Sequence, residues 1–341
     1  MQSGFLRFVR GTAILFAELT LILCLIAAGA PLLASAIPPL SIFEHLLLQT
    51  LLGSACCFIV LLACRRWLTA AVSGALALWC VVAIGSPLIS FDETSANSAN
   101  PEKLKLISLN LWAGSPTQDA TLRYLTLSQA DVIGLVEVTP SWLAALQPLN
   151  KLYPFQIGCA QLSRDCDTLL LSKHPFARSY AGRLDSEAPA VAWAEINWLG
   201  HNIIILETHL SWPFSAAAPA QLNTGDASAA VDPLPGVPHL AQGQQAARLA
   251  RYLAIFSNDV VVMGDFNSTP WSRLQLAFAK AAGLRNWGHL ALSWPSWAPM
   301  PFRLPIDQIF ARGAIDIEQA ARGPAVDSDH FPISVIVQRR P

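Results

Sequence analysis

Charged residues are scarce in this sequence. Asp, Glu, Lys and Arg make up 13% of the 341 residues and 53% are hydrophobic, whereas soluble domains contain about 25% charged residues. A chain this hydrophobic is not intrinsically disordered, and its composition argues against an ordinary cytosolic enzyme. An excess of either sign is also lacking, because 22 basic residues face 23 acidic ones. No bulk basic charge therefore indicates a nucleic-acid partner, although a local basic patch would be compatible with these numbers.

The charges are missing mainly from the first quarter of the chain. Residues 1–90 contain four basic and two acidic residues, whereas residues 91–341 contain 18 and 21. Three apolar runs lie in the first part: Thr12–Ala30, Leu46–Ala63 and Leu68–Ile89. Each is close to the ~20 residues with which a helix crosses a ~30 Å hydrocarbon core. The sequence thus predicts a membrane anchor over residues 1–90, with three transmembrane helices in the lipid bilayer, and a polar linker over residues 91–102.

The first apolar run has a second interpretation. Arg7 and Arg10 precede it and Ala34–Ala36 follows it, as in a cleaved signal peptide. The length of the run, and the two apolar runs after it, favour a membrane helix instead. Glu18 lies inside this run and could serve as a proton or ion site. A single carboxylate near a helix end is more typical of an interhelical contact.

The basic residues of the anchor predict its orientation. Arg7 and Arg10 place the N-terminus in the cytoplasm by the positive-inside rule, and Arg65 and Arg66 place the second loop there too. With three spans, residues 91–341 would then lie outside the cytoplasm.

The cysteines agree with this topology. Five lie in or beside the apolar runs: Cys24, Cys56, Cys57, Cys64 and Cys80. The other two, Cys159 and Cys166, would pair as a disulfide in an oxidising compartment and would stay free thiols in the cytosol. A zinc site is disfavoured because no second Cys/His pair has the required spacing.

From Lys103 onward the pattern is that of an α/β domain, with short β-rich runs between turns and amphipathic segments. Strands are predicted at Leu104–Leu109, Val132–Val136, Thr168–Ser172, Ala190–Trp198, Asn202–Thr208, Val260–Met263, Gln308–Ala311 and Ile333–Gln338. Helices are predicted at Gln118–Ser128, Pro140–Gln147, Leu240–Phe256 and Trp271–Ala282. This mixture favours sheets that are covered by helices on their outer faces.

Polar residues stand at the ends of several predicted strands. They are Asn110, Glu137, His209, Asp265, Asn267 and, at a strand start, Asp307. Any one of them alone would be explained as a turn residue. The ordered set instead indicates a site held by a rigid sheet, because functional residues gather where loops leave such a scaffold.

Six segments in this order carry a family resemblance: LISLNLWAG, DVIGLVEV, ETHLSWP, VVMGDFNSTPWS, PIDQIFAR and VDSDHFPISV, within residues 106–336. The chain resembles the endonuclease/exonuclease/phosphatase superfamily, and GDFNSTPWS is most similar to its membrane-anchored bacterial branch. GDFN together with SDH is a specific signal, whereas either alone would be weak. The resemblance implies a four-layer α/β (α+β) sandwich with two packed β-sheets, a catalytic domain over residues 103–341, and a place on the periplasmic or extracellular side of a bacterial inner membrane.

The resemblance also implies a metal ion. Phosphoester cleavage needs an activated water, neutralised charge on the phosphoryl oxygens and a stabilised leaving group. Glu137 matches the principal metal carboxylate, with Asn110 beside it and Asp329 supporting the ion or its waters. Such hard oxygen ligands suit Mg²⁺ or Mn²⁺.

The remaining residues match catalytic positions of the family. Asp265 would orient or deprotonate the attacking water, and Asn267 would hold that water or a phosphoryl oxygen, because alternating residues of an extended chain face the same way. His330 would contact the phosphate, with Asp307 fixing its tautomer. His209 would bind phosphoryl oxygens or assist the leaving group. Which group is the general base stays open.

Three functions compete. The first is a metal-dependent phosphoesterase that acts outside the cytoplasm on lipid head groups or small phosphoesters, either as diesters or as monoesters. A nuclease on DNA or RNA is disfavoured by the balance of 18 basic and 19 acidic residues over 101–341. It is also disfavoured because we do not recognise the Arg or Tyr that nucleases of this family place between the Glu and His motifs. The segment AVAWAEI offers Trp193 instead. An inactive binding module on a membrane anchor is disfavoured because every expected catalytic position is filled.

The Ala/Pro-rich stretch 213–239 is expected either to rim the site or to be disordered.

Overall fold

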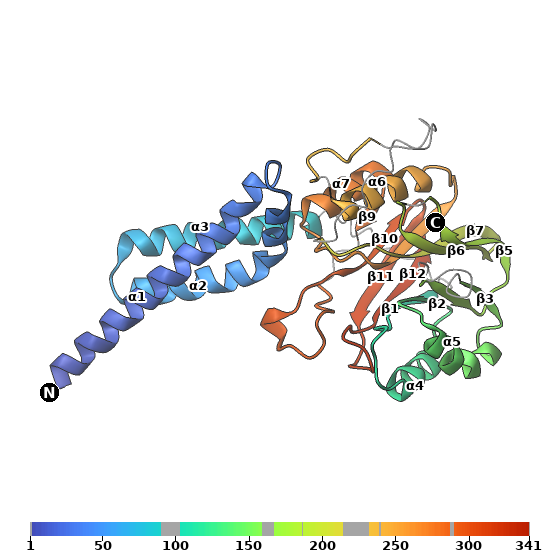
Figure 1. Cartoon of the computed structure of the whole chain (residues 1–341), viewed down its shortest axis with the longest axis horizontal. Coiled ribbons are helices and arrows are strands. Elements are labelled where there is room, and N and C mark those ends of the chain that lie inside the picture. Colours follow the sequence, from blue (N-terminus) through green and yellow to red (C-terminus); the bar gives the residue numbers. More distant parts are fainter. Residues whose placement is uncertain are drawn as a thin grey trace. The chain divides into compact units, whose positions relative to one another are not determined.

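A computed structural model shows the fold of the chain (Figure 1). It describes residues 2–89, 103–158, 167–185, 187–213, 232–238, 240–286 and 290–340. The predicted linker 91–102, the predicted Cys159–Cys166 disulfide and most of the stretch 213–239 lie outside the described residues. Contacts divide the chain into two compact units, Met1–Ile89 and Ser90–Pro341.

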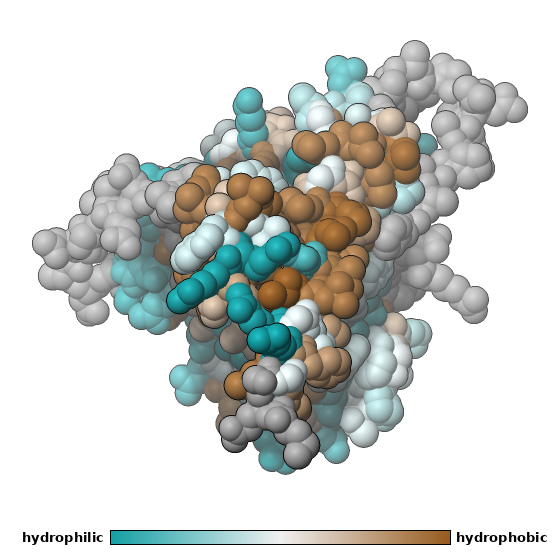
Figure 2. Space-filling view, turned by 90° about the vertical axis from the view of Figure 1, so that its left-hand side faces the viewer, coloured by the Kyte–Doolittle hydropathy of each residue, from teal (hydrophilic) through white to brown (hydrophobic). Residues whose placement is uncertain are grey.

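The first unit is entirely helical. Its elements are α1 (Gln2–Gly29), the 3-10 helices η1 (Ala30–Leu33) and η2 (Pro38–Leu46), α2 (Leu47–Ala63) and α3 (Trp67–Ile89). Three spans are long and apolar enough to cross a membrane: Gly4–Leu33, Pro38–Ala63 and Trp67–Pro87. Only 17 to 22% of the most apolar window of each span is buried, and hydrophobic residues cover much of the face seen in Figure 2. An apolar surface of this kind indicates a membrane anchor.

Polar contacts connect the helices of this unit. Arg66 Nη2 donates to Glu18 Oε1 over 2.7 Å, so Glu18 joins α1 to the turn between α2 and α3. Arg10 Nη2 donates to the backbone oxygen of Cys64 over 2.6 Å. Glu18 thus makes an interhelical contact. The contact of Arg10 also places the arginines of α1 at the same end of the unit as Arg65 and Arg66, which is what the positive-inside argument requires.

The second unit contains two six-stranded mixed sheets. The first has the order β11-β12-β1-β2-β4-β3. Its strands are β1 (Leu104–Asn110), β2 (Val132–Val136), β3 (Phe155–Gly158), β4 (Leu169–Ser172), β11 (Ile315–Arg322) and β12 (Ile333–Arg339). β1 and β2 run parallel, and the other neighbours are antiparallel.

The second sheet repeats this plan with the order β5-β6-β7-β8-β10-β9. Its strands are β5 (Phe176–Arg183), β6 (Ala190–Trp198), β7 (His201–His209), β8 (Asp259–Asp265), β9 (Arg285–Asn286) and β10 (Asp307–Arg312). Here β7 and β8 form the parallel pair. Each sheet therefore has one pair of parallel strands whose carboxyl ends lie side by side.

Helices cover the outer face of each sheet (Figure 1). The helices are α4 (Asp119–Leu127), α5 (Pro140–Leu146), the 3-10 turn η3 (Gln147–Lys151), α6 (Ala241–Leu253), α7 (Arg273–Ala282) and the 3-10 turn η5 (Met300–Phe302). One buried cluster packs α4 and α5 on the first sheet, a second packs α6 and α7 on the second sheet, and a third fills the space between the sheets. The predicted four-layer α/β sandwich is confirmed.

Four strands escaped prediction, namely β3, β5, β9 and β11. All four are the outermost strands of their sheets. An outer strand has only one neighbour, so it needs less apolar surface, and β5 for example has no buried residue. The eight predicted strands are the inner ones, which are covered on both faces.

Candidate active site

The predicted site residues meet between the two sheets, where the carboxyl ends of the parallel strand pairs lie. Asn110 ends β1 and Glu137 follows β2, whereas His209 ends β7 and Asp265 ends β8. Asp307 opens β10 directly opposite Asp265 in the ladder. Asp329 and His330 lie in the turn that leads into β12.

Asn110 joins two carboxylates of the site. Its Nδ2 donates to Glu137 Oε1 over 2.9 Å and to Asp265 Oδ2 over 3.0 Å. Its Oδ1 accepts from the backbone N–H of Trp112 over 2.9 Å. The amide nitrogen, rather than the oxygen that a metal would need, therefore faces the carboxylates. In this arrangement Asn110 orients Glu137 and Asp265, and its ligand role stays a prediction.

The backbone around the Glu137 carboxylate adopts an unusual conformation. Glu137 has φ 58°, and Trp112, which donates to Asn110, has φ 57°. Left-handed conformations of such residues are uncommon and cost roughly 1–3 kcal/mol where the surrounding structure imposes them. The Glu137 side chain is also fixed, since its Oε2 accepts from the backbone N–H of Ala113 over 2.7 Å. The structure thus holds this carboxylate in one direction.

The expectation that Asp265 and Asn267 lie in an extended chain is wrong. Asn267 has φ 49°, and its backbone N–H donates to Asp265 Oδ1 over 2.8 Å, which makes a tight turn after β8. Its Nδ2 donates to the backbone oxygen of Leu210 over 2.8 Å and lies 3.4 Å from His209 Nε2. Gly264 precedes this turn with φ 142°, and a Cβ there would lie 1.9 Å from the Thr208 oxygen. The first position of the GDFN motif, Gly264, therefore requires glycine, and the turn follows it.

His330 and Asp307 form a buried pair on one side of Asp265. His330 Nδ1 lies 2.8 Å from Asp307 Oδ2, and Nε2 lies 3.6 Å from Asp265 Oδ2 and 4.0 Å from Asp329 Oδ1. Burial lowers the pKa of His330, but the charges of Asp307 and Asp265 outweigh it and raise the pKa to about 10. His330 is therefore a cation at neutral pH. Asp329 is held from its other side, because Trp294 Nε1 donates to its Oδ2 over 3.0 Å.

A second histidine–aspartate pair lies on the other side of Asp265. His209 Nδ1 lies 2.8 Å from Asp167 Oδ2, and His209 Nε2 lies 3.8 Å from Asp265 Oδ2. Burial lowers the pKa of His209, but Asp167 and Asp265 raise it to about 9. Sequence reasoning missed Asp167. The available signal was its place two residues before β4, close to a strand start, as Asp307 is at the start of β10.

Asp265 lies between these two cations. Its pKa is raised to about 6, chiefly by burial, against which the charge of His330 acts. A carboxyl group with this pKa can take up and release a proton near neutral pH. Asp265 is therefore the group of the site that is best matched to general-base chemistry.

A further acid, Glu207, lies on β7 two residues before His209. Sequence reasoning missed it as well. Its Oε1 accepts from Ser108 Oγ over 2.7 Å, and Oε2 has no hydrogen-bond partner among the described residues. Burial raises the pKa of Glu207 well above its usual range. Gly134 of β2 makes room for it, because a Cβ there would lie 1.9 Å from Glu207 Oε2.

The comparisons with known proteins agree with this geometry. Residues 107–330 match the model of the Endonuclease/Exonuclease/phosphatase family. The chain belongs to this family. Its members are generally phosphoester hydrolases and commonly use divalent metal ions. A search of curated protein sequences gives no significant match.

Solved structures show the same fold with diverse substrates. Sphingomyelinase C from Streptomyces griseocarneus is 15% identical with a TM-score of 0.50, over 70% of this chain and 100% of that one. A mannosyl-6-phosphatase from Bacteroides thetaiotaomicron is 15% identical with a TM-score of 0.50, over 69% and 99%. TDP2 from D. rerio, complexed with a single-strand DNA product, is 17% identical with a TM-score of 0.50, over 70% and 99%. The structural similarity supports the fold of this chain. At such low sequence identities it leaves the substrate open.

Proposed function

We propose that the protein hydrolyses a phosphoester in a reaction that depends on Mg²⁺ or Mn²⁺, with its domain outside the cytoplasm. The observation that carries the proposal is the placement of Asp265 between two histidine–aspartate pairs, beside the fixed carboxylate of Glu137. Family membership supports phosphoester hydrolysis as the reaction. Lipid head groups and small phosphoesters, as diesters or monoesters, are the proposed substrates.

The donor set fits a hard divalent cation. Glu137 and Asp329 supply carboxylate oxygens, and each of these oxygens keeps a lone pair beyond the single N–H or ring contact that it makes. Asp307 Oδ1 is buried without a hydrogen-bond partner among the described residues, so this oxygen keeps its capacity to accept a further contact. When bound, Mg²⁺ or Mn²⁺ would neutralise charge on the phosphoryl oxygens and stabilise the leaving group.

A second set of residues could also hold a cation. One ligand atom each from Asp265, Asp307 and His330 lie within 4.8 Å of one another, and all three residues are buried. Against this set, Asp307 already occupies His330 Nδ1, whereas Glu137 and Asp329 are the ligands that the family resemblance predicts. We therefore assign the ion to Glu137 and Asp329, with Asn110 orienting the carboxylate.

The protein side chains then have separate tasks. His330 and His209 point their Nε2 atoms toward Asp265 from two sides, at 3.6 and 3.8 Å. As cations they would bind the phosphoryl oxygens and stabilise the charge that develops in the transition state. Asp307 and Asp167 hold the opposite ring nitrogens and keep both rings in place. Asp265 would accept the proton of the attacking water, and Asn267 would hold that water.

The location of the domain follows from the anchor. Three apolar spans precede the domain, and the arginines of α1 lie at the same end of the anchor as Arg65 and Arg66. We propose that this end faces the cytoplasm of a bacterium, which puts the catalytic domain on the periplasmic or extracellular side of the inner membrane. Accessibility of a cysteine introduced at Ser141 to a membrane-impermeant reagent in whole cells tests this orientation, with labelling only after lysis as the contradicting result.

A substrate panel tests the reaction. The full-length chain in detergent micelles is assayed with bis-p-nitrophenyl phosphate, p-nitrophenyl phosphate, sphingomyelin, phosphatidylglycerol, plasmid DNA and RNA, each with Mn²⁺, with Mg²⁺ and with EDTA. The proposal expects hydrolysis of a lipid or small phosphoester that EDTA abolishes. Hydrolysis of DNA or RNA alone would replace the substrate class by nucleic acid, and hydrolysis of nothing by folded protein would overturn the proposal.

A further inference from the structure

One loop of the second unit presents apolar side chains to the solvent. Residues 293–304 lie between β9 and β10, and in Figure 1 they stand off from the sandwich as an orange-red loop. Trp297, Met300 and Phe302 of this loop are 79%, 59% and 66% exposed. Trp297 is the most exposed large hydrophobic side chain among the described residues of this unit. Single exposed apolar residues are common, but three within one short loop indicate a binding surface. These three side chains are called the apolar surface of the loop.

Hydrogen bonds within the loop fix its shape. Trp294 N–H donates to the backbone oxygen of Leu304 over 3.1 Å, and Leu304 N–H donates back to the Trp294 oxygen over 2.5 Å, which closes the base of the loop. Arg303 Nε donates to the backbone oxygen of Ala298 over 2.6 Å, and Arg303 Nη2 donates to that of Ser296 over 3.2 Å. Because the backbone and Arg303 make these bonds, the shape of the loop does not depend on burial of its apolar surface.

The same loop is attached to the catalytic centre. Ser296 N–H donates to the backbone oxygen of Asp329 over 2.7 Å, and Ser296 Oγ donates to that of Ser328 over 2.8 Å. Trp294 Nε1 donates to the carboxylate of Asp329, and the Trp294 ring centroid lies 6.4 Å from that of His330. A partner bound to the apolar surface of the loop would therefore be held at a fixed place beside Asp329 and His330.

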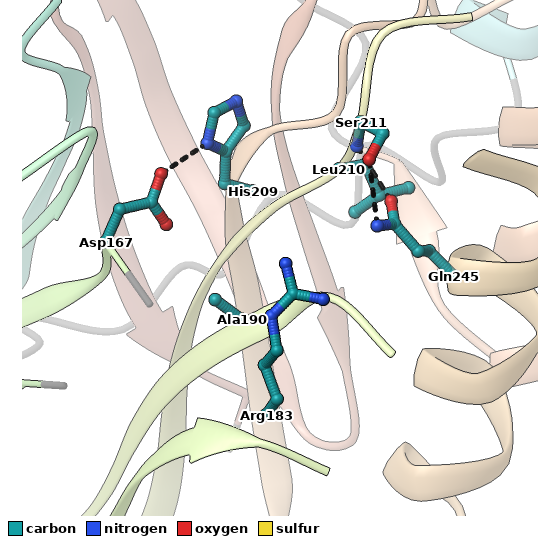
Figure 3. A pocket seen from close by; sticks show the side chains of 7 residues that line it. All are labelled: Asp167, Arg183, Ala190, His209, Leu210, Ser211 and Gln245. Atoms are coloured by element: carbon teal, nitrogen blue, oxygen red, sulfur yellow. Dashed lines mark hydrogen bonds and ion pairs between the residues drawn. The ribbon is translucent and has the colours of Figure 1, made fainter. Parts of the chain in front are cut away.

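The other side of the centre, where His209 approaches Asp265, is polar. A pocket of about 260 Å³ opens there, lined by side chains with hydrogen-bonding groups (Figure 3): Asp167, Arg183, His209, Ser211 and Gln245. None of the residues 293–304 lines this pocket. A partner of apolar chemistry would thus approach the centre from the side of His330.

The composition of the loop matches the boundary between lipid and water. Residues 290–306 contain no Asp, Glu or Lys, and Arg303 is their only charged residue, so no charge of the loop repels an anionic head group. Trp and Phe are side chains that enter such a boundary. The chain also carries three apolar spans of its own. An anchored domain meets the bilayer at high effective concentration, whereas a protein partner would have to be found by diffusion.

We propose that the loop of residues 293–304 docks with Trp297, Met300 and Phe302 on the surface of a lipid bilayer and so holds the catalytic centre at that surface. The docking is independent of the chemistry, but its consequence rests on the proposed phosphoesterase function. It makes phosphoesters of membrane lipids the substrates, in preference to small soluble ones. A second copy of the chain and another protein are the alternative occupants of the loop.

Photo-crosslinking tests the docking itself. The full-length chain is reconstituted in vesicles of phosphatidylcholine and phosphatidylglycerol, with p-benzoylphenylalanine in place of Phe302. Matched controls carry it in place of Leu127 or Ile255, exposed apolar residues at and just after the ends of α4 and α6. Irradiation should give lipid adducts at Phe302 in several-fold higher yield than at either control. Trp297→Ser combined with Met300→Ser should lower that yield. Equal yields at all three positions, or adducts of Phe302 with protein alone, would overturn the proposal.

Kinetics test what the docking does. The triple variant Trp297→Ser, Met300→Ser and Phe302→Ser is compared with wild type in the same vesicles, supplemented with sphingomyelin. Its turnover of phosphatidylglycerol or sphingomyelin should fall roughly 10- to 100-fold more than its turnover of soluble bis-p-nitrophenyl phosphate, because only the lipid needs the docked loop. Leu127→Ser is the control and should show no such difference.

The outcomes separate the docking from the reaction. An equal fall for lipid and soluble ester would show that the loop only supports the fold of the centre, and hydrolysis of the soluble ester but of no lipid would overturn the lipid assignment. Failure of wild type to hydrolyse any compound would count against the phosphoesterase function itself. The crosslinks would still decide whether the loop docks on lipid.

Discussion

Two histidine–aspartate pairs flank Asp265, and they differ in how far they are shut off from solvent. In one pair, the His330 and Asp307 side chains are 5% and 1% exposed. In the other pair, the His209 and Asp167 side chains are 19% and 31% exposed. The buried pair contacts Asp265 and Asp329 and lies beside Trp294, whereas the open pair lines a pocket. We propose that the first pair serves the reaction and that the second serves both the reaction and substrate binding.

The largest effect is expected at the group that both pairs share. Asp265→Asn keeps the shape but cannot accept a proton, so kcat should fall by about 10³-fold or more, with KM nearly unchanged. Steady-state kinetics with bis-p-nitrophenyl phosphate and saturating Mn²⁺ measures this. Arg251→Gln serves as the control that alters a distant charge. Retention of more than a tenth of the wild-type turnover by folded Asp265→Asn would remove Asp265 from the centre of the comparison.

The aspartates of the two pairs should differ in effect. Asp307→Asn leaves His330 in a buried place with the wrong partner, and we expect a fall in kcat of roughly 10²- to 10⁴-fold, as general acid–base and electrostatic contributions are of that size. Asp167→Asn alters the more open pair and should lower kcat about tenfold while raising KM. Parallel kinetics of the two variants measure the split. Equal effects on kcat and KM would show that the pairs do not divide the work.

Gly134 of β2 packs against the buried side chain of Glu207, and this packing should matter for stability. In Gly134→Ala the new Cβ would lie 1.9 Å from Glu207 Oε2 and 2.8 Å from Met263 Cε. Overpacking of this kind should lower the free energy of unfolding of the domain by about 1–3 kcal/mol. Glu207→Ala should relieve the clash, so the double variant should be more stable than additivity predicts. Additive effects in denaturant unfolding would show that Glu207 moves aside freely.

A further effect concerns pH. The folded-state pKa values of His209 and His330, about 9 and about 10, lie above the unfolded value near 6.5. Their contribution to stability is therefore complete below about pH 6.5 and is lost as the pH rises through 9 and 10. In the metal-free protein we expect a loss on the order of 2 kcal/mol per pair over this range.

Thermal unfolding in EDTA between pH 6 and 10.5 measures that loss. Asp167→Asn should remove the part that ends near pH 9 and leave the part that ends near pH 10. An identical pH dependence in wild type and Asp167→Asn would contradict the assignment of the first step to His209.

The sequence predicted the inner part of the domain and missed its outer edges. Buried on both faces, the eight inner strands read as apolar runs, whereas the four outer strands, such as β5 and β11, carry mixed residues. The candidate site residues could be found because each lies at or near an end of an inner strand. Asp167 lies near such an end too, but it was missed because its partner, His209, is distant in sequence. Glu207 was hidden within an apolar strand.

The local conformation of the motifs was also beyond sequence reasoning. The sequence indicated that Asp265 and Asn267 share a site, but the extended chain assumed for them is a left-handed turn in the structure. Asn110 was expected to offer an oxygen to the metal, and its hydrogen bonds instead turn the amide nitrogen toward Glu137 and Asp265. In both cases the residue type was informative, whereas its direction depended on hydrogen bonds made only in the folded chain.

Isotope incorporation tests the central claim most directly. Single turnover of bis-p-nitrophenyl phosphate by the full-length protein in H₂¹⁸O should place one ¹⁸O atom in the p-nitrophenyl phosphate product. This should occur with Mn²⁺, and neither in EDTA nor in Asp265→Asn. Label in the nitrophenol instead of the phosphate, or metal-independent labelling that Asp265→Asn retains, would contradict water activation by Asp265 at a metal-dependent phosphoesterase site.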